Sequence, residues 1–587
     1  MQSQDAGALR SIAEPDSLAW LGPRGFSGQP HWKLDILRLP APTTPRPSDP
    51  SIPYLAIFHC YHTVQSIGDH VHRLVKAADG WRIGAEIPEG ETLGFRVKDH
   101  RITARIEPKS ARCTFTDDAV VEGTGSSAGN LCLLRLSDVL TVDSLAIRSE
   151  GGAVAKPIEY ATAPGCIALT APPKTFTLAL KYHGVYNATG QDSYINAKEA
   201  SLTSYWWPNT ARMPATLSVT ATVPKGWIAE AQGEPKGTAT AGETTTYSFR
   251  NDIPVCYFTL DAAPYVVTTR EIGGKRVSVY LLKANPGRAK VALDQFGRAV
   301  SFFGKAFARF PYTHYEMVET AGPFGGALEA YSFATYGPGA FNAVVHELSH
   351  TWWGGIVPNT YLHTMWNESF ADYSDSLETR MTGEEAKTPA LRNQHRAPDY
   401  GRRLLTSYAV PAMQAFDTSN GPHDAVGYGK GAEVMAMLED LLGTDTMLKC
   451  MRRFIADHPK GEPGEWPEFE RAVDRETGRD YGWFFEQWLN RGGVPVVGIA
   501  NVKQVAGEVS FDVVQEGTPY RLRIPVAVEM QDGKTVRRTI EVRSLTESIR
   551  LSGLAGAKSA TLDPDGSVLM AGRKTDDSTT NPFVGKL

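Results

Sequence analysis

The sequence lacks any apolar run of the roughly 18 residues that a membrane-spanning helix needs, and it has no collagen-like or heptad repeat. It also lacks a basic excess, because 60 Lys and Arg stand against 65 Asp and Glu, for a formal net charge of −5. Proteins that bind nucleic acid or membrane surfaces in general need a basic face. We therefore expect a soluble protein with no transmembrane segment and no nucleic-acid partner.

Cysteine is scarce, and the six cysteines lie far apart without a Cys-x-x-Cys pair that would suggest a zinc ribbon or a redox dithiol. We expect most of them to be buried as small apolar side chains. The first residues, Met1 to Gly7, lack the basic and apolar regions of a signal peptide. The compartment stays open: cytoplasmic, or periplasmic or secreted with the signal peptide already removed.

The chain has 587 residues, 42% of them apolar and 21% charged, which is typical of a folded protein. Its length suggests roughly four domains. Composition and periodicity predict these segments: an N-terminal module (1–104) with a Pro-rich connector (40–53), a β-rich domain (105–267), a mainly helical domain (268–492), a β-sandwich (493–572) and a loose tail (573–587).

Local patterns support these predictions. Apolar and polar residues alternate over 176–182 and 216–223, which favours strands. Asp532-Gly533 between two alternating stretches predicts a hairpin turn. Apolar residues with helical spacing predict a helix at the start of the third segment: Ala292, Phe296, Val300 and Phe303.

A possible metal site lies at His346-Glu347-Leu348-Ser349-His350. Residues i and i+4 share one face of a helix, so both imidazoles can converge on one ion. Glu347 is turned by about 100° from His346, where it can reach a water on that ion and act as a base. The alternative is a surface helix with two stacked histidines.

A catalytic zinc needs a third protein ligand and an open position for water. Glu368, in the sequence Trp366-Asn367-Glu368-Ser369, follows His350 after 17 intervening residues and is the candidate for this ligand. Two His and one Glu form the ligand set of hydrolytic zinc sites. Asp372, one turn later, either orients a ligating His or is an exposed helix carboxylate.

With these motifs the chain resembles the zinc aminopeptidases of the aminopeptidase N and leukotriene hydrolase family, which are gluzincins. Residues 325–331, Gly-Gly-Ala-Leu-Glu-Ala-Tyr, are similar to the Gly-Ala-Met-Glu-Asn segment of that family. The resemblance implies that Glu329 binds the free α-amine of the substrate. It also implies that the backbone at Gly326 and Ala327 pairs with the peptide like an edge strand.

Two further segments carry the resemblance. Residues 427–432, Gly-Tyr-Gly-Lys-Gly-Ala, are similar to the Tyr-x-Lys-Gly-Ala segment, which implies that Tyr428 stabilises the oxyanion. Residues 196–200, Asn-Ala-Lys-Glu-Ala, precede an aromatic-Pro turn as the family's second amine-recognition segment does, which implies that Glu199 is a second amine ligand.

The resemblance covers roughly residues 105–570 and implies a multidomain α+β fold. We expect a β-rich N-terminal region, a thermolysin-like, mainly helical zinc domain and a small C-terminal β-sandwich, without the family's C-terminal helical superhelix. Two departures stand out. Family members have eighteen residues between the second His and the Glu, a spacing that would place Ser369 there, and Ala330 replaces an Asn beside the amine-binding Glu.

The implied function is zinc-dependent removal of N-terminal residues from peptides. One zinc ion per chain is expected at His346, His350 and Glu368, with Glu347 as general base and then acid. The partner is a peptide with a free N-terminus, while the oligomeric state stays unknown. The alternatives are a thermolysin-like endopeptidase and a non-catalytic binding scaffold that retains the fold.

Overall fold

The structure of the protein is a computed structural model. No helix in the described part of the chain combines the length and the apolar composition that a membrane crossing requires. The structure describes these residues, with side chains from residue 94 onward: 31–38, 54–61, 66–77, 80–86, 94–124, 131–148, 160–170, 173–187, 193–203, 205–210, 212–322, 326–383, 405–408, 410–415, 421–459, 461–573 and 581–587.

The chain divides into two compact units, one of residues 1–362 and 455–464, the other of residues 363–454 and 465–587. The first unit begins with an antiparallel sheet in the order β1-β2-β3-β4. Its strands are β1 (His31–Arg38), β2 (Tyr54–Tyr61), β3 (Ser66–Ala77) and β4 (Gly80–Glu86). The predicted Pro-rich connector, 40–53, lies outside the described residues.

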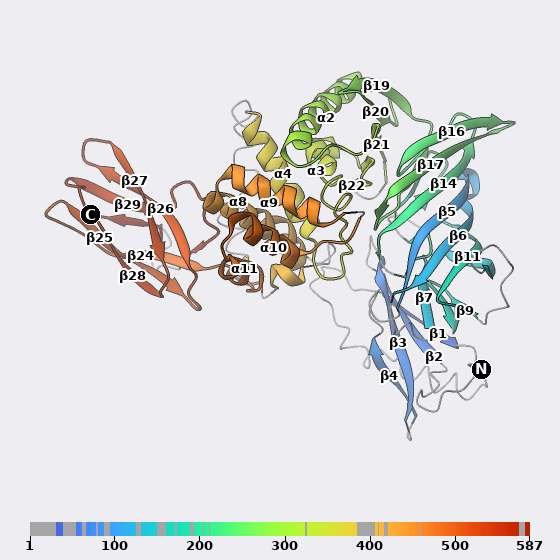
Figure 1. The fold of residues 1–587 in the computed structure, drawn as a ribbon, viewed down its shortest axis with the longest axis horizontal. Helices are drawn as coiled ribbons and strands as arrows, with labels where there is room; N and C mark the ends of the chain where they lie inside the picture. Colours follow the sequence, from blue (N-terminus) through green and yellow to red (C-terminus); the bar gives the residue numbers. More distant parts are fainter. Residues whose placement is uncertain are drawn as a thin grey trace. The chain divides into compact units, whose positions relative to one another are not determined.

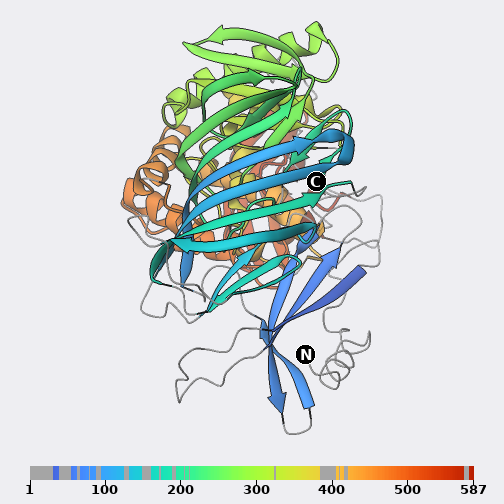
Figure 2. The ribbon, with the colours of Figure 1, turned by 90° about the vertical axis from the view of Figure 1, so that its right-hand side faces the viewer.

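A seven-stranded sheet forms the centre of the first unit, in the order β16-β17-β14-β5-β6-β11-β8 (Figure 2). Buried and partly exposed residues alternate along β14, so one face of the sheet packs into the core. β5 begins at Phe95, so the domain boundary predicted at 104 falls inside this strand. The strands are β5 (Phe95–Glu107), β6 (Arg112–Gly123), β8 (Leu140–Arg148), β11 (Thr175–Val185), β14 (Ala215–Pro224), β16 (Glu234–Ala241) and β17 (Thr244–Val255).

Two smaller sheets accompany it, in the orders β7-β10-β9 and β12-β13-β18-β15. Their strands are β7 (Leu131–Arg135), β9 (Tyr160–Ala163), β10 (Cys166–Thr170), β12 (Tyr194–Ile195), β13 (Ala200–Leu202), β15 (Ile228–Ala231) and β18 (Leu260–Ala263). The predicted burial of cysteine is confirmed for the five cysteines with described side chains, three of which lie in β6, β7 and β10.

The first unit ends in a five-stranded sheet with the order β19-β20-β21-β23-β22 and two main helices (Figure 1). Its elements are β19 (Val266–Ile272), β20 (Lys275–Leu281), α2 (Pro286–Ala306), β21 (His314–Glu319), β22 (Ala327–Glu329), β23 (Phe333–Tyr336) and α3 (Val344–Ser349). The side chain of Asn285 caps α2 by accepting from the backbone N–H of Arg288. All four apolar residues that predicted α2 are buried, which confirms the helix.

The second unit begins with helices around an aromatic core in which Phe370 contacts Trp366, Phe454, Trp466 and Phe469. Its elements are α4 (Trp366–Met381), the 3-10 turn η5 (Ala412–Gln414), α7 (Gly421–Asp424), the π-helical turn η6 (Ala425–Lys430), α8 (Gly431–Leu442), α9 (Thr444–Asp457), α10 (Trp466–Thr477) and α11 (Gly482–Leu489). The order of β-rich and helical parts along the chain confirms the predicted fold class.

A β-sandwich follows, with sheets in the orders β28-β25-β24-β30 and β27-β26-β29-β31. The hairpin predicted at Asp532-Gly533 is confirmed, since it joins β26 and β27 and Gly533 has φ +80°. The strands are β24 (Val496–Val505), β25 (Glu508–Glu516), β26 (Leu522–Met530), β27 (Thr535–Val542), β28 (Thr546–Leu551), β29 (Ala557–Leu562), β30 (Ala571–Gly572) and β31 (Val584–Lys586).

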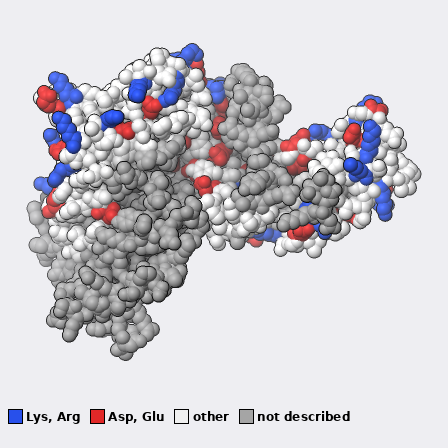
Figure 3. Space-filling model, turned by 180° about the vertical axis from the view of Figure 1, so that it is seen from behind, with Lys and Arg blue, Asp and Glu red and all other residues white. Residues whose placement is uncertain are grey.

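The end of the chain differs from the expected loose tail, because β31 pairs with β29 at the edge of one sheet. Close packing holds it there: a side chain on Gly585 would overlap Val502. The sandwich surface mixes basic and acidic side chains (Figure 3). Some of these side chains form local ion pairs, such as Arg543–Glu541 at 2.7 Å.

The turn η6 lies directly against the start of α4. Gly427 and Gly431, four residues apart, face α4, where a Cβ on Gly427 would overlap Met365 and a Cβ on Gly431 would overlap the Oγ of Ser369. Ser369 donates a short hydrogen bond to the carbonyl of Gly427. Single π-helical turns are often found at functional sites, and here two glycines allow the backbone to approach α4 closely.

We predict that Gly431→Ala destabilises the protein by about 1–3 kcal/mol, because the added methyl group would overlap the Oγ of Ser369 and force the start of α8 away from α4. Gly429→Ala is the matched control: its Cβ would meet no described atom within 4 Å, and alanine favours the helix by about 1 kcal/mol. Thermal unfolding midpoints of both variants test this. Equal midpoints would contradict the close contact.

Candidate functional site

The two histidines of the predicted metal motif converge. His346 lies on α3, His350 is the residue that ends this helix, and their Nε2 atoms are 3.1 Å apart. The Nδ1–H of His350 donates to the carbonyl of Trp353 at 2.9 Å, which leaves Nε2 of that ring as the basic nitrogen. Trp352 and Trp353 are fully buried and anchor the end of the helix in the core.

Two buried carboxylates stand beside these rings. One ligand atom from each of Glu329, Glu347 and His350 lies within 4.8 Å of the others. Burial raises the pKa of the Tyr315 hydroxyl well above its ordinary value, and the negative charge of nearby Glu347 raises it further. Tyr315 therefore stays a neutral phenol beside the predicted base.

Glu329 is the last residue of β22, the edge strand of the five-stranded sheet. Ala327 pairs with Tyr336 of β23, and the carbonyl of Gly326 accepts from the N–H of Gly337 at 2.8 Å. One side of β22 is thus fixed in the sheet. The sheet order makes β22 an edge to which an extended peptide can add.

A tyrosine that no sequence motif indicated contacts Glu329. The hydroxyl of Tyr361 donates to Oε1 of Glu329 at 3.3 Å, and the guanidinium of Arg212 lies over the Tyr361 ring at 4.9 Å. Neither residue belongs to a recognisable pattern. The only local signal was Asn359, whose side chain accepts from the N–H of Tyr361 in an Asx turn.

Glu199, the second predicted amine ligand, is 4% exposed and lies between β12 and β13. Its Oε2 accepts from the N–H of Ala321 at 2.9 Å and from the hydroxyl of Thr320 at 3.4 Å. Thr320 follows β21, so the carboxylate is tied to the sheet that carries Glu329 at its edge.

In the second unit, Glu368 lies in the first turn of α4 and is 3% exposed. The side-chain amide of Asn367 donates to its Oε1 at 3.1 Å. Ser369, at the spacing usual in the family, uses its hydroxyl to hold Gly427 instead. Asp372 lies on α4 and is partly buried. Its predicted role as a group that orients a ligating His stays a prediction.

Tyr428 lies on η6 and is half-buried. Two residues on, Lys430 is completely buried and its Nζ donates to the carbonyl of Arg491 at 2.6 Å. Burial lowers the pKa of this amine from 10.5 to about 8. The lysine thus fixes the end of the turn that carries Tyr428.

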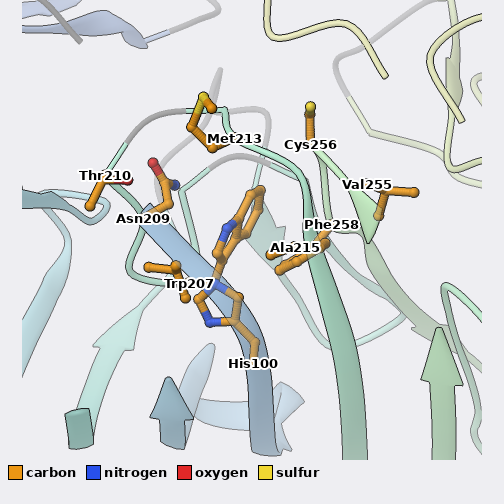
Figure 4. A pocket seen from close by; sticks show the side chains of 10 residues that line it. His100, Trp207, Asn209, Thr210, Met213, Ala215, Val255, Cys256 and Phe258 are labelled. Carbon is orange, nitrogen blue, oxygen red and sulfur yellow. The ribbon is translucent and has the colours of Figure 1, made fainter. Parts of the chain in front are cut away.

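A separate small cavity lies in the β-rich part of the first unit (Figure 4). His100 lines it, and its Nδ1 pairs with the buried Asp117 at 2.7 Å. Among its walls are Asn209 and Thr210, each with a buried oxygen that has no hydrogen-bond partner among the described residues. Polar walls of this kind suit an ordered water, and no predicted site residue lines the cavity.

Part of the chain is similar in sequence to known proteins. Residues 292–488 match the peptidase family M1 domain. The chain is 26% identical to aminopeptidase N of Lactobacillus helveticus over 39% of its own length and 30% of that protein. It is 25% identical to aminopeptidase M1 of Arabidopsis thaliana over 38% of its own length and 28% of that protein. The sequence matches thus span less than a third of either relative.

The fold is also similar to that of a solved structure, aminopeptidase A of Legionella pneumophila in complex with aspartic acid. The TM-score is 0.69 at 13% identity, over 83% of this chain and 60% of that one. At this identity the likeness concerns the fold, and it extends well beyond the segment that matches the family. The family resemblance suspected from the sequence is confirmed.

We predict a pH dependence of stability from Lys430. The unfolded chain binds more protons than the folded chain between the folded pKa of about 8 and the ordinary 10.5. The free energy of unfolding should therefore rise across this range, by up to about 3 kcal/mol, while below pH 8 the full cost of the buried charge is present.

Urea unfolding of the wild type and of Lys430→Met at pH 7.5, 9 and 10.5 measures this difference. The variant should lack the rise. Lys449→Met, at an exposed position of α9, is the control and should follow the wild type. A wild type and Lys430→Met with parallel pH profiles would show that the buried amine does not titrate in this range.

Proposed function

Because the chain carries a peptidase family M1 domain, we propose that it is a zinc-dependent aminopeptidase that removes N-terminal residues from peptides. The observation that carries this proposal is a second buried carboxylate near the predicted base. Glu329, on the edge strand β22, lies close to Glu347 and His350. A zinc endopeptidase needs one such base, whereas an aminopeptidase also needs an anion for the substrate ammonium.

We propose that His346, His350 and Glu368 hold one zinc ion per chain. The residues fit the metal: tetrahedral zinc at its usual bond lengths of 2.0–2.1 Å separates two nitrogen ligands by about 3.3 Å, and the two Nε2 atoms here are 3.1 Å apart. Two His and one Glu are the set found in hydrolytic zinc sites.

The zinc, when bound, would lower the pKa of a water and polarise the scissile carbonyl. Glu347 takes the proton of the attacking water and later gives it to the leaving amine. The Tyr428 hydroxyl donates to the oxygen that becomes negative as the carbonyl is attacked. Glu329 and Glu199 bind the substrate ammonium, and the backbone at Gly326 and Ala327 aligns the peptide along β22.

The two alternatives gain no support from a specific feature. The relatives named above are aminopeptidases. A peptide with a free N-terminus is therefore the expected substrate. Two buried carboxylates for amine capture would have no purpose in an endopeptidase.

We predict that Glu347→Gln keeps zinc and loses at least a hundredfold in turnover of aminoacyl-anilides, because the amide cannot accept the water proton. Steady-state rates and metal content measure both effects. An acetylated substrate should not be cleaved by the wild type. Internal cleavage of acetylated peptides would favour the endopeptidase instead, and turnover by Glu347→Gln close to that of the wild type would contradict the assignment of the base.

We predict that Glu368→Ala loses stoichiometric zinc, because only two protein ligands remain. Ser369→Ala is the matched control and should keep the metal, since the Ser369 hydroxyl is bonded to Gly427. Elemental analysis of both purified variants after dialysis gives the zinc content. Zinc loss in Ser369→Ala with retention in Glu368→Ala would show that the usual family spacing holds in this chain.

A further inference from the structure

We propose that Tyr361 is a positioning residue for the carboxylate of Glu329, and that Arg212 holds Tyr361 in place. This inference rests on the proposed function, in which Glu329 binds the substrate ammonium. The carrying observation is a chain of contacts within the first unit: Arg212 over the Tyr361 ring at 4.9 Å, and the Tyr361 hydroxyl on Oε1 of Glu329 at 3.3 Å.

The backbone of Tyr361 is held in an unusual conformation. Its φ of 56° lies in the left-handed region, which costs a residue with a side chain about 1–2 kcal/mol. The N–H of Tyr361 donates to the side chain of Asn359 at 2.9 Å, and Asn359 is completely buried. A conformation of this cost persists only where its surroundings enforce it, and here it directs the ring toward Glu329.

Arg212 comes from the β-rich part of the first unit. Its guanidinium lies over the rings of Tyr361 and, at 6.0 Å, of Tyr257, so cation–π attraction links the two tyrosines. The segments on either side of Arg212 and Tyr257 form walls of the small cavity in Figure 4, where Met213 and Cys256 are seen. The guanidinium thus contacts a ring of the β-rich part, Tyr257, and the ring of Tyr361.

The chemical consequence concerns the free energy of binding the amine. A hydroxyl that donates to one carboxylate oxygen stabilises the ionised form and limits rotation of the group. The substrate ammonium then meets a carboxylate whose orientation is already set, and less conformational entropy is lost on binding. Tyr361 should therefore affect recognition of the amine in the ground state and the transition state alike.

The test begins with Tyr361→Phe in the full-length, zinc-loaded protein. We expect KM for aminoacyl-anilides to rise five- to tenfold with kcat within twofold of the wild type, as loss of uniform binding predicts. Tyr247→Phe is the matched control, because its hydroxyl donates to the carbonyl of Trp227 in the β-rich part and should leave both constants unchanged.

Two further measurements separate positioning from general damage. In calorimetry, Tyr361→Phe should weaken binding of an amino acid amide five- to tenfold and leave binding of the corresponding amide without the amine unchanged. In the Glu329→Gln background, Tyr361→Phe should have no further effect, because the two act through one carboxylate. Arg212→Met should shift amide binding in the same direction and add nothing to Tyr361→Phe.

The outcomes distinguish this inference from the proposed function. A wild type that cleaves no aminoacyl-anilide would overturn the proposed function, while calorimetry with the amide would still test Tyr361. Two other outcomes with an active wild type would overturn the positioning role alone. In one, Tyr361→Phe weakens binding of both amides equally. In the other, Tyr361→Phe has the same effect in the Glu329→Gln background as in the wild type.

Discussion

The hydrogen bond from Nδ1 of His350 to the carbonyl of Trp353 is the constraint on which the site depends. It fixes which nitrogen of His350 is basic and turns that nitrogen toward His346. The bond exists because the chain turns sharply after α3 and buries two tryptophans there. Packing of apolar side chains thus determines which ring nitrogen of His350 is basic. In metal sites in general, hydrogen-bond partners of the ligating histidines orient these rings in the same way.

Two candidate site residues of the second unit are positioned by a different means. Its candidate ligand, Glu368, and its candidate oxyanion donor, Tyr428, lie on two elements that touch through glycine and a short polar side chain. Ser369 forms the contact, so it is occupied in holding the turn. This packing supports the proposed choice of Glu368 over its neighbour, because the hydroxyl of Ser369, the residue at the usual family spacing, is already bonded to Gly427.

Local periodicity made much of this predictable. The strands of the large sheet, helix α2 and the histidine pair all depend on spacings of two, or of three to four residues, which the sequence displays directly. The short strand β31 escaped prediction because three residues at a sheet edge carry no period. Tyr361 and Arg212 escaped it for another reason, since Tyr361 lies 32 residues from Glu329 and Arg212 comes from a different sheet region.

The charges near His350 bear on the substrate proposed for this protein. Glu329 and Glu347 are both buried near His350, and two carboxylates in a region of low dielectric constant repel each other strongly. Such a pair is stable in its ionised form only with hydrogen-bond donors and cations nearby. Tyr361 supplies one donor, and a divalent metal ion and a substrate ammonium would supply the cations. In the proposed function, this group of carboxylates is complete only when both a metal ion and a substrate ammonium are bound, which would link metal binding to recognition of a free N-terminus.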